Sequence, residues 1–295
     1  MAPFDQPHSD TLTAFRGSLA ERLALAGRPD AAPELLVLLA ADAAEAVRRT
    51  VAENPDAPSH AHRLLAQDPV AAIRISLARK LAAQAGELAR NLADRRAGLA
   101  WEALLLLAQD LSEEVRHAVA DTLADLPNAP RGLVLALARD AALAVCEPLV
   151  RLSRVLTEED LIALVRAPPG PGSRIAVARR LQLAASVSVA VVESGDVPAM
   201  AALLRNPTAR IPPWALGVLV ELAGEEPSLH EPLACRPALP APLLSRLAGL
   251  VADELLSQWT EQKRLPPEVA NFMRAAKARQ KLEAPGPRRH IWATS

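Results

Sequence analysis

Aromatic residues are scarce in this sequence, and their scarcity limits what the hydrophobic core can be made of. Only 2% of the 295 residues are aromatic, and there is no Tyr. Hydrophobic residues still make up 51% of the chain, so the core must be built from Ala, Leu, Val and Ile. Sheets usually draw on aromatic and β-branched residues, whereas Ala and Leu favour helices. The composition therefore predicts an all-α protein.

The chain also has few cysteines, almost no net charge and no long apolar run. Cys146 and Cys235 are the only cysteines, too few and too far apart for a disulfide framework or a zinc site. The formal net charge of −1 gives no overall attraction to nucleic acid or acidic membranes. No apolar stretch approaches the roughly 20 residues that span a bilayer. The first ten residues lack the basic start and apolar run of a signal peptide. These absences predict a cytoplasmic protein without a membrane span.

Sequence motifs with known chemistry are absent as well. The six His residues show no metal-ligand spacing, and no Gly-x-Ser-x-Gly motif occurs. The loop at Gly170 to Ser173 lacks the Lys and the spacing of a phosphate-binding loop. Paired acids such as Glu113 and Glu114 are expected at helix starts, where the helix dipole favours negative charge. The sequence therefore predicts no catalytic residue, no cofactor and no metal, and thus a protein that is not an enzyme.

What the sequence does contain is an internal repeat, which indicates stacked supersecondary units. Each of four copies has apolar residues, then an Asp, then a β-branched residue five positions after that Asp. In three copies an Arg follows the Asp by six positions, and in the fourth copy Cys146 takes the place of this Arg. The residues of this pattern are Asp42/Arg48, Asp68/Arg74, Asp110/Arg116 and Asp140.

The repeat predicts pairs of short helices joined by turns. Helices of about 8–12 residues are marginal alone, so each pair must cover the apolar stripe of its neighbour. Stacking of this kind predicts an α-solenoid of short antiparallel helix pairs with a right-handed superhelix. Each Asp is expected where the second helix begins, accepting hydrogen bonds from free backbone N–H groups. The Arg is placed to pair with an acid of its own or the next repeat. We therefore interpret the seven repeat residues as a structural ladder and not as a catalytic set.

Proline and composition divide the chain. We expect a flexible leader over residues 1–10, a single repeat domain over 11–260, and a basic C-terminal helix with a frayed tail over 261–295. One amphipathic helix is predicted over residues 11–26. A Pro-free insertion over about 82–102 is expected to form an extra helix.

Two further local patterns mark helix ends. Asn-Pro pairs at Asn54 and Asn206 are expected to end helices, because Pro cannot continue one. Thr157 followed by Asp160 resembles a capping box that starts a helix.

Tryptophan and basic residues are the candidates for binding a partner. Trp101 lies in the insertion, and Trp259 lies beside the C-terminal segment. Buried Trp and Arg dominate binding interfaces, although a Trp can equally fill a junction between repeats. Residues 261–290 hold eight Lys or Arg against three acids, so they form either a binding segment or a solvated helix. The candidate partner-binding residues are Trp101, Arg95, Arg96, Trp259, Lys263, Arg264, Arg274 and Lys277.

The order of short segments along the chain resembles a known family. Val115-Arg116 is followed by Leu126-Pro127-Asn128-Ala129-Pro130, then by Glu147-Pro148-Leu149-Val150 and by Leu204-Arg205-Asn206-Pro207. Over roughly residues 35–255 this order resembles the bacterial family catalogued as domain of unknown function 2336, which is similar to leucine-rich-variant and HEAT-like repeats. The spacing of Asp and Arg likewise resembles the ladder of HEAT-type repeats. The resemblance implies an α-solenoid and supplies no activity or catalytic residues.

Three functions are compatible with these patterns. The first is a protein-binding scaffold or regulatory adaptor whose protein partner and oligomeric state the sequence does not identify. The second is a nucleic-acid-binding repeat protein that resembles the HEAT-like alkylpurine glycosylases. The near-neutral charge and the scarcity of aromatics to stack on bases argue against this second function. The third is a carrier of an apolar ligand in a groove between helices.

Overall fold

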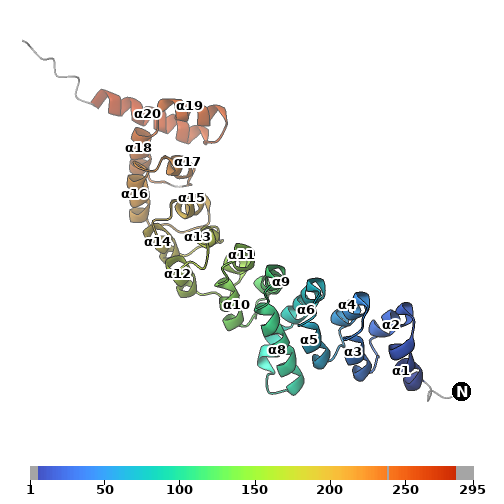
Figure 1. The fold of residues 1–295 in the computed structure, drawn as a ribbon. Helices are drawn as coiled ribbons and strands as arrows, with labels where there is room; N and C mark the ends of the chain where they lie inside the picture. Colours follow the sequence, from blue (N-terminus) through green and yellow to red (C-terminus); the bar gives the residue numbers. More distant parts are fainter. Residues whose placement is uncertain (1–5, 238, 284–295) are drawn as a thin grey trace, which may run out of the picture. The chain divides into compact units, whose positions relative to one another are not determined.

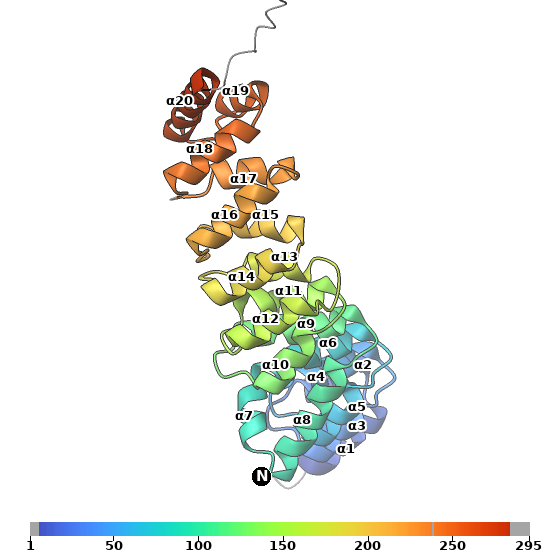
Figure 2. The ribbon, with the colours of Figure 1, turned by 90° about the vertical axis from the view of Figure 1, so that its left-hand side faces the viewer.

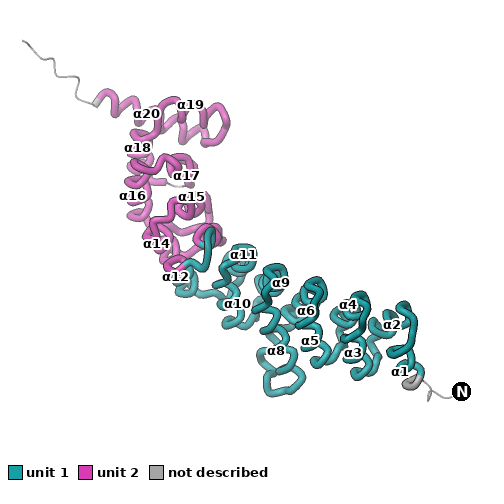
Figure 3. Tube along the Cα trace, in the orientation of Figure 1, with its two compact units in different colours: residues 1–164, 168–173 teal, residues 165–167, 174–295 magenta. Residues whose placement is uncertain are grey.

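The computed structural model describes residues 6–237 and 239–283, and every regular element within them is a helix. The predicted all-α class is therefore confirmed. The chain divides into two compact units, unit 1 with residues 1–164 and 168–173 and unit 2 with residues 165–167 and 174–295 (Figure 3). The repeat domain expected over residues 11–260 spans both units. Along the described residues, no helix has the length and apolar character needed to cross a membrane.

Unit 1 is built from short helices that contact one another in a regular order (Figure 1). Its helices are α1 (Gln6–Arg16), α2 (Leu19–Ala26), α3 (Pro33–Leu39), α4 (Glu45–Glu53), α5 (Ser59–Leu65), α6 (Ala71–Ala83), α7 (Ala85–Arg90), α8 (Arg95–Ala108), α9 (Glu113–Ala124), α10 (Arg131–Ala138), α11 (Leu143–Leu152) and most of α12 (Glu158–Arg166). Helices α2, α4, α6, α9 and α11 each contact the next in this series, and so do α3, α5, α8 and α10.

The core of unit 1 consists of aliphatic side chains from these helices. In α6, Ile73, Leu77 and Leu81 recur every four residues and are fully buried. Burying one such side chain contributes about 1.5–3 kcal/mol to the free energy of folding. A row of them, one on each turn, stabilises a helix that is too short to persist alone. Val47 and Val51 form the same stripe in α4.

The helix predicted over residues 11–26 is wrong, because the structure has two helices there. Helix α1 ends at Arg16, and α2 begins at Leu19. Between them, Ser18 and Glu21 form a capping box: the Ser18 N–H donates to Glu21 Oε2 at 2.7 Å, and the Glu21 N–H donates to Ser18 Oγ at 3.4 Å. The spacing of Ser18 and Glu21 is the signal for this start, and the apolar periodicity on either side conceals it.

The N-terminal boundary also differs from the sequence-based expectation. Residues 6–10, assigned to a flexible leader, belong to α1, and the carboxylate of Asp10 pairs with Arg28. The pairing ties the first helix to the turn after α2. Residues 1–5 of the expected leader lie outside the described residues.

The insertion over residues 82–102 contains an extra helix, the short α7, but this helix fills only part of it. Helix α6 continues to Ala83, the short α7 follows, and α8 runs unbroken from Arg95 to Ala108. The second half of the insertion is therefore the first half of a long repeat helix. Asp94 caps α8 by accepting from the Ala97 N–H at 2.9 Å. Helices α7 and α8 contact each other (Figure 2).

Unit 2 is also helical, and its elements range from the 3-residue η2 to the 17-residue α20. Its helices are α13 (Ser173–Ala178), α14 (Ala185–Glu193), α15 (Val197–Arg205), α16 (Pro213–Leu222), the 3-10 turn η2 (Pro227–Leu229), α17 (His230–Ala234), α18 (Ala241–Leu250), α19 (Asp253–Glu261) and α20 (Pro267–Glu283). Within it, α16 contacts α18, and α18 contacts α20. The frayed tail expected after residue 284 lies outside the described residues.

Candidate functional site

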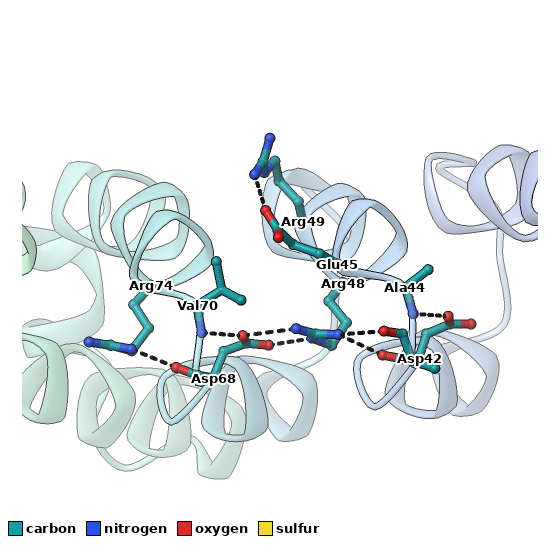
Figure 4. A network of polar contacts seen from close by, with 9 residues as sticks. Asp42, Ala44, Glu45, Arg48, Arg49, Asp68, Val70 and Arg74 are labelled. Atoms are coloured by element: carbon teal, nitrogen blue, oxygen red, sulfur yellow. Dashed lines mark hydrogen bonds and ion pairs between the residues drawn. The ribbon is translucent and has the colours of Figure 1, made fainter.

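Three arginines of the repeat link neighbouring helix pairs in unit 1. In each link, the arginine Nε lies 2.6 Å from a carboxylate oxygen of the Asp in the following repeat: the pairs are Arg48–Asp68, Arg74–Asp110 and Arg116–Asp140. The same guanidinium also donates backwards, as Arg48 Nη1 does to the Asp42 carbonyl at 2.8 Å (Figure 4). Planar guanidinium groups suit such bidentate pairing with carboxylates. Each arginine therefore binds two successive repeats.

The aspartates of the ladder close the turn before each second helix. Asp42 Oδ1 accepts from the Ala44 N–H at 2.8 Å, and Asp68 Oδ1 accepts from the Val70 N–H at 2.9 Å (Figure 4). Asp110 and Asp140 do the same with the residue two positions later. The accepting side chain thus lies two residues before the N-cap of the helix and not at the N-cap itself. Each of these aspartates therefore uses its two carboxylate oxygens to bind the backbone N–H of its own turn and the arginine of the previous repeat.

Burial and hydrogen bonding act in opposite directions on the pKa of Asp140. Burial raises the pKa of Asp140, but hydrogen bonds from Arg116 and from the Ala142 N–H outweigh it. The pKa of Asp140 therefore lies below its ordinary value, and the carboxylate stays charged at neutral pH. A charged, paired and largely buried carboxylate fits a structural contact better than proton transfer.

Two further ladder contacts were missed by the sequence analysis. Arg22 Nε lies 2.7 Å from Asp42, so the ladder begins one helix earlier, at α2. At the other end, Arg131 pairs with Asp160 at 2.8 Å. Arg131 lies at the start of α10, a first helix, so the offset of six residues could not reveal it.

Cys146, which replaces the ladder arginine, is only 1% exposed. Burial raises the pKa of its thiol to about 11. A thiol that stays protonated is a weak nucleophile, and its Sγ donates to the Leu143 carbonyl at 3.7 Å. Cys146 therefore acts as a small apolar side chain.

A buried asparagine occupies an equivalent corner in each unit. In unit 1, Asn54 Nδ2 donates to the carbonyls of Ala26 at 2.7 Å and Arg28 at 3.2 Å. In unit 2, Asn206 Nδ2 donates to the carbonyls of Ala178 at 2.9 Å and Arg180 at 2.7 Å. Both asparagines are at most 7% exposed. The Asn-Pro pairs therefore do more than end helices, because each amide also satisfies carbonyls at the end of an earlier helix.

A lysine and a histidine meet beside the Asn54 corner. Lys80 Nζ donates to the Asn54 carbonyl and lies 3.1 Å from His62 Nε2. Burial, and then the charge of Lys80, lower the pKa of His62 to about 3. Burial lowers the pKa of Lys80 to about 8. His62 is thus neutral at physiological pH and accepts a hydrogen bond from the lysine.

An apolar groove lies between α8 and α10 in unit 1. It has a volume of about 340 Å³ and is lined by Trp101, Leu105, Ala108, Gln109, Gly132, Leu133, Ala136, Leu137 and Asp140. Trp101 is partly exposed in the wall, whereas Leu133 and Leu137 are buried in the floor. Helix α8 touches α10 at fewer residues than it touches α5. Of the candidate residues, only Trp101 lines this groove.

The other candidates near Trp101 do not line the groove. Arg95 and Arg96 are exposed at the first turn of α8. Their charge is placed unfavourably with respect to the helix dipole. No hydrogen bond or ion pair of their side chains occurs among the described residues.

The candidates near the C-terminus are mostly bound within the chain. Lys277 pairs with Asp253 at 2.6 Å and donates to the Val251 carbonyl. Arg264 pairs with Glu231 at 2.5 Å. Among the described bases of this segment, Arg264, Lys277 and Lys281 are thus ion-paired within unit 2, the last two with the same Asp253.

Three other C-terminal candidates have different surroundings. Arg274 Nη2 donates to Thr260 Oγ1 at 2.9 Å, and Lys263 is an exposed residue with a φ of 55° after α19. Trp259 is only 7% exposed and belongs to the core, which favours the alternative that it fills a junction between helices. Among the described residues, no group of three His, Cys, Asp or Glu side chains could hold a metal ion.

Comparisons with known proteins give one match. The model of a family described as "Uncharacterised protein conserved in bacteria (DUF2336)" matches residues 145–293, which is half of the chain. The family resemblance seen in the sequence is confirmed, but over this range and not over residues 35–255. The ladder repeats from Asp42 to Asp140 precede the match. No curated protein and no solved structure matches the chain.

Proposed function

The chain belongs to the bacterial family DUF2336, and on that premise we propose that it is a non-enzymatic scaffold or regulatory adaptor that binds another protein. We propose that its helix pairs form a HEAT-like α-solenoid of antiparallel pairs with a right-handed superhelix, and that it acts in the cytoplasm. Such repeats present extended surfaces built from many short helices, which suits the recognition of a macromolecule.

The groove between α8 and α10 is the observation that carries this proposal. It leaves Trp101 partly exposed in a chain whose aromatic content is 2%. Exposing a Trp and several aliphatic side chains to water is unfavourable, and a binding partner that covers them would recover that free energy. The charged residues of the repeat are meanwhile engaged with one another and with backbone carbonyls.

The test is affinity purification of the tagged full-length chain from its native host, with crosslinking and mass spectrometry at moderate salt. One dominant protein partner, crosslinked to one set of helices, is the expected result. Recovery of no protein partner, or turnover of a small molecule by the purified chain, would overturn the proposal.

The same purification distinguishes the two alternative functions. Nucleic acid that co-purifies and is lost as salt rises would support the nucleic-acid-binding alternative, because phosphate contacts are salt-dependent. A co-purified lipid would support the apolar-ligand carrier. The ion pairs of Arg264 and Lys277 within unit 2 engage part of the basic C-terminal segment, and the net charge of the chain is only −1, so the first alternative has less support.

A further inference from the structure

Four loops of unit 2 are tied to one another by hydrogen bonds. Each leads from an odd-numbered helix to the next even-numbered helix between α13 and α20, and they comprise residues 179–184, 206–212, 235–240 and 262–266. Asn206 Nδ2 donates to the Arg180 carbonyl at 2.7 Å, and Arg236 Nη1 donates to the Asn206 carbonyl at 2.7 Å. Cys235 Sγ donates to the Arg264 carbonyl at 3.2 Å. Together the four segments form a loop row.

The loop row is basic. It contains six Lys or Arg and no Asp or Glu, and its bases are Arg179, Arg180, Arg210, Arg236, Lys263 and Arg264. When the four helix residues on either side of each loop are included, the count becomes seven bases against three acids. The preceding loop of the chain, residues 153–157 of unit 1, adds two bases and three acids by the same count, so an excess of positive charge remains.

The connections at the other ends of the same helices are acidic. From α14 to α15, from α16 to η2 and from α18 to α19, the connections and the four residues on either side hold seven acids and no Lys or Arg: Glu193, Asp196, Glu221, Glu225, Glu226, Asp253 and Glu254. Bases from elsewhere in the unit pair with three of these acids, as Arg246 does with Glu221. Charge is therefore segregated within unit 2, although the whole chain has a formal charge of only −1.

Each loop of the row carries positive charge that is not neutralised within the unit. Arg179, Arg210 and Lys263 lie in the first, second and fourth loops, are exposed, and form no ion pair among the described residues. Arg236, in the third loop, donates to backbone carbonyls only. Burial lowers the pKa of Arg236, and no acid opposes that effect. The row is therefore complementary to negative charge, which selects partners and orients them during encounter.

The spacing of the loops fits an extended peptide. Helices α14, α16, α18 and α20 contact one another in turn, and packed helices lie about 8–10 Å apart. An extended chain advances about 3.3 Å per residue, so about every third residue of such a chain meets a loop. Phosphates follow one another about every 3.4 Å along each strand of a duplex, roughly three times more closely. The spacing therefore favours carboxylates on a peptide, which guanidinium groups bind bidentately.

Two exposed apolar side chains adjoin the exposed arginines. Leu181 is 68% exposed and follows Arg179 by two residues, and Trp214 is 58% exposed in the first turn of α16, four residues after Arg210. Trp and Arg are the residues that most often dominate binding energy at protein interfaces. Trp214 is the single exposed aromatic residue of the row and its adjoining turns, and one is too few to stack successive bases.

We propose that the loop row of unit 2 binds an extended acidic segment of a partner protein, with Asp or Glu at about every third residue. This inference rests on the proposed protein-binding function and names a site and the chemistry of the partner. Carboxylates of the segment pair with Arg179, Arg210 and Lys263 in succession, and apolar residues between them cover Leu181 and Trp214.

The probe is a fluorescein-labelled peptide of about 12 residues with the repeated sequence Asp-Leu-Ser, which in extended form is long enough to reach all four loops. One matched peptide replaces every Asp by Asn, and another keeps the composition but places all Asp residues together. Fluorescence anisotropy with the full-length chain at low salt measures binding. The spaced Asp peptide is expected to bind about ten times more tightly than the Asn peptide and about three times more tightly than the clustered one.

Charge reversal in three different loops locates the site. Arg179→Glu, Arg210→Glu and Lys263→Glu should each weaken binding of the spaced peptide about three-fold, and the loss should shrink as salt screens the charges. Their melting temperatures should be unchanged, because these side chains are exposed and unpaired. Arg279→Glu is the matched control, since it makes the same change in net charge at an exposed arginine of α20 outside the loop row. It should leave binding unchanged.

Several outcomes would overturn this inference. Equal binding of the Asn peptide removes the role of charge, and equal weakening by Arg279→Glu and Arg210→Glu removes the site. Tighter binding of a labelled single-stranded DNA of matched length than of the spaced peptide assigns the loop row to nucleic acid instead. If the peptide does not bind but crosslinking recovers a protein partner on the helices of unit 1, the scaffold proposal stands without this site.

Discussion

Unit 1 and unit 2 solve one structural problem by different means. Every short helix ends with backbone carbonyls that need donors, and every helix must be tied to the next. In unit 1, ladder arginines such as Arg48 supply both a donor to a carbonyl and a pair to a carboxylate. In unit 2, Arg236 donates to the carbonyls of Leu203, Asn206 and Ala209 without any carboxylate. A carbonyl-binding cation is therefore common to both units. Unit 2 also pairs two such cations with acids, Arg174 with Asp196 and Lys277 with Asp253, but the regularly repeated ladder of Arg and Asp is a feature of unit 1.

The asparagine corner is where the two units agree, and its loss should have the largest effect. Asn54→Ala and Asn206→Ala each remove two hydrogen bonds to carbonyls at a helix end, one of them fully buried, so each should lower the free energy of unfolding by about 3 kcal/mol. Chemical denaturation measures this change. Asn128→Ala, at an exposed asparagine, should change it by less than about 0.5 kcal/mol. A large loss for one corner and none for the other would break the equivalence.

The ladder is where the units differ, and Arg116→Ala tests it. Removal of Arg116 leaves Asp140 charged and largely buried, so unfolding free energy should fall by about 2 kcal/mol, less than for a fully buried pair. Denaturant midpoint and slope give the value. Arg151→Ala, which breaks an exposed pair with Glu147, should cost less than about 0.5 kcal/mol. If Arg116→Ala melts normally yet abolishes partner binding, the structural interpretation of the ladder is wrong.

His62 should make unit 1 sensitive to acid. Its pKa is about 3 in the folded chain against 6.5 ordinarily, so the unfolded chain binds the proton more readily. The stability is complete above pH 6.5 and is lost as pH falls toward 3, by about 2 kcal/mol at pH 5. Unfolding at pH 7 and pH 5 should show a smaller difference for His62→Gln than for the unmodified chain. His60→Gln, at an exposed position of the same helix, should retain the full difference.

Lys80 should give the smallest effect, in the same direction as His62 but at alkaline pH. Its pKa is about 8 in the folded chain against 10.5 ordinarily, so the stability of unit 1 should rise between pH 8 and 10. Because Lys80 is partly solvated, the gain should be only about 1 kcal/mol. Lys80→Arg should remove the rise, since a guanidinium stays charged throughout this range. Arg236, its counterpart in unit 2, predicts no such rise there.

Local spacing explains what the sequence could reveal. The helical class follows from composition, and the capping box of Thr157 and Asp160 is confirmed by reciprocal bonds of 3.0 and 3.3 Å. The offset of six residues made the ladder visible in the sequence. In each repeat the Asp lies in the turn before the second helix, and the Arg lies in that helix. Neither Arg22 in α2 nor Arg131 in α10 follows an Asp by six residues. Only folding therefore brings Arg22 to Asp42 and Arg131 to Asp160.

Long-range partners explain what the sequence could not reveal. Lys277 is one of several bases in the C-terminal segment, and no residue close to it in the sequence predicts its contact with Asp253. Trp259 lies in α19, and its burial depends on how α19 and α20 pack, which the local sequence does not show. In each Asn-Pro pair, proline alone is enough to end the helix. The asparagine before it was therefore a second, separate signal. A buried polar residue at a repeated corner calls for its own explanation.

Each ladder arginine joins its own repeat to the next, and this double attachment has a consequence for cooperativity. Local opening of one turn in unit 1 removes a partner from the repeat before it, so openings should spread between nearest neighbours instead of staying confined. Amide hydrogens of α4, α6 and α9 should therefore exchange with similar free energies, as one foldon does. Arg74→Ala, which breaks the link between α6 and Asp110, would divide that foldon, and amide exchange in α4 and α6 would then occur independently of that in α9.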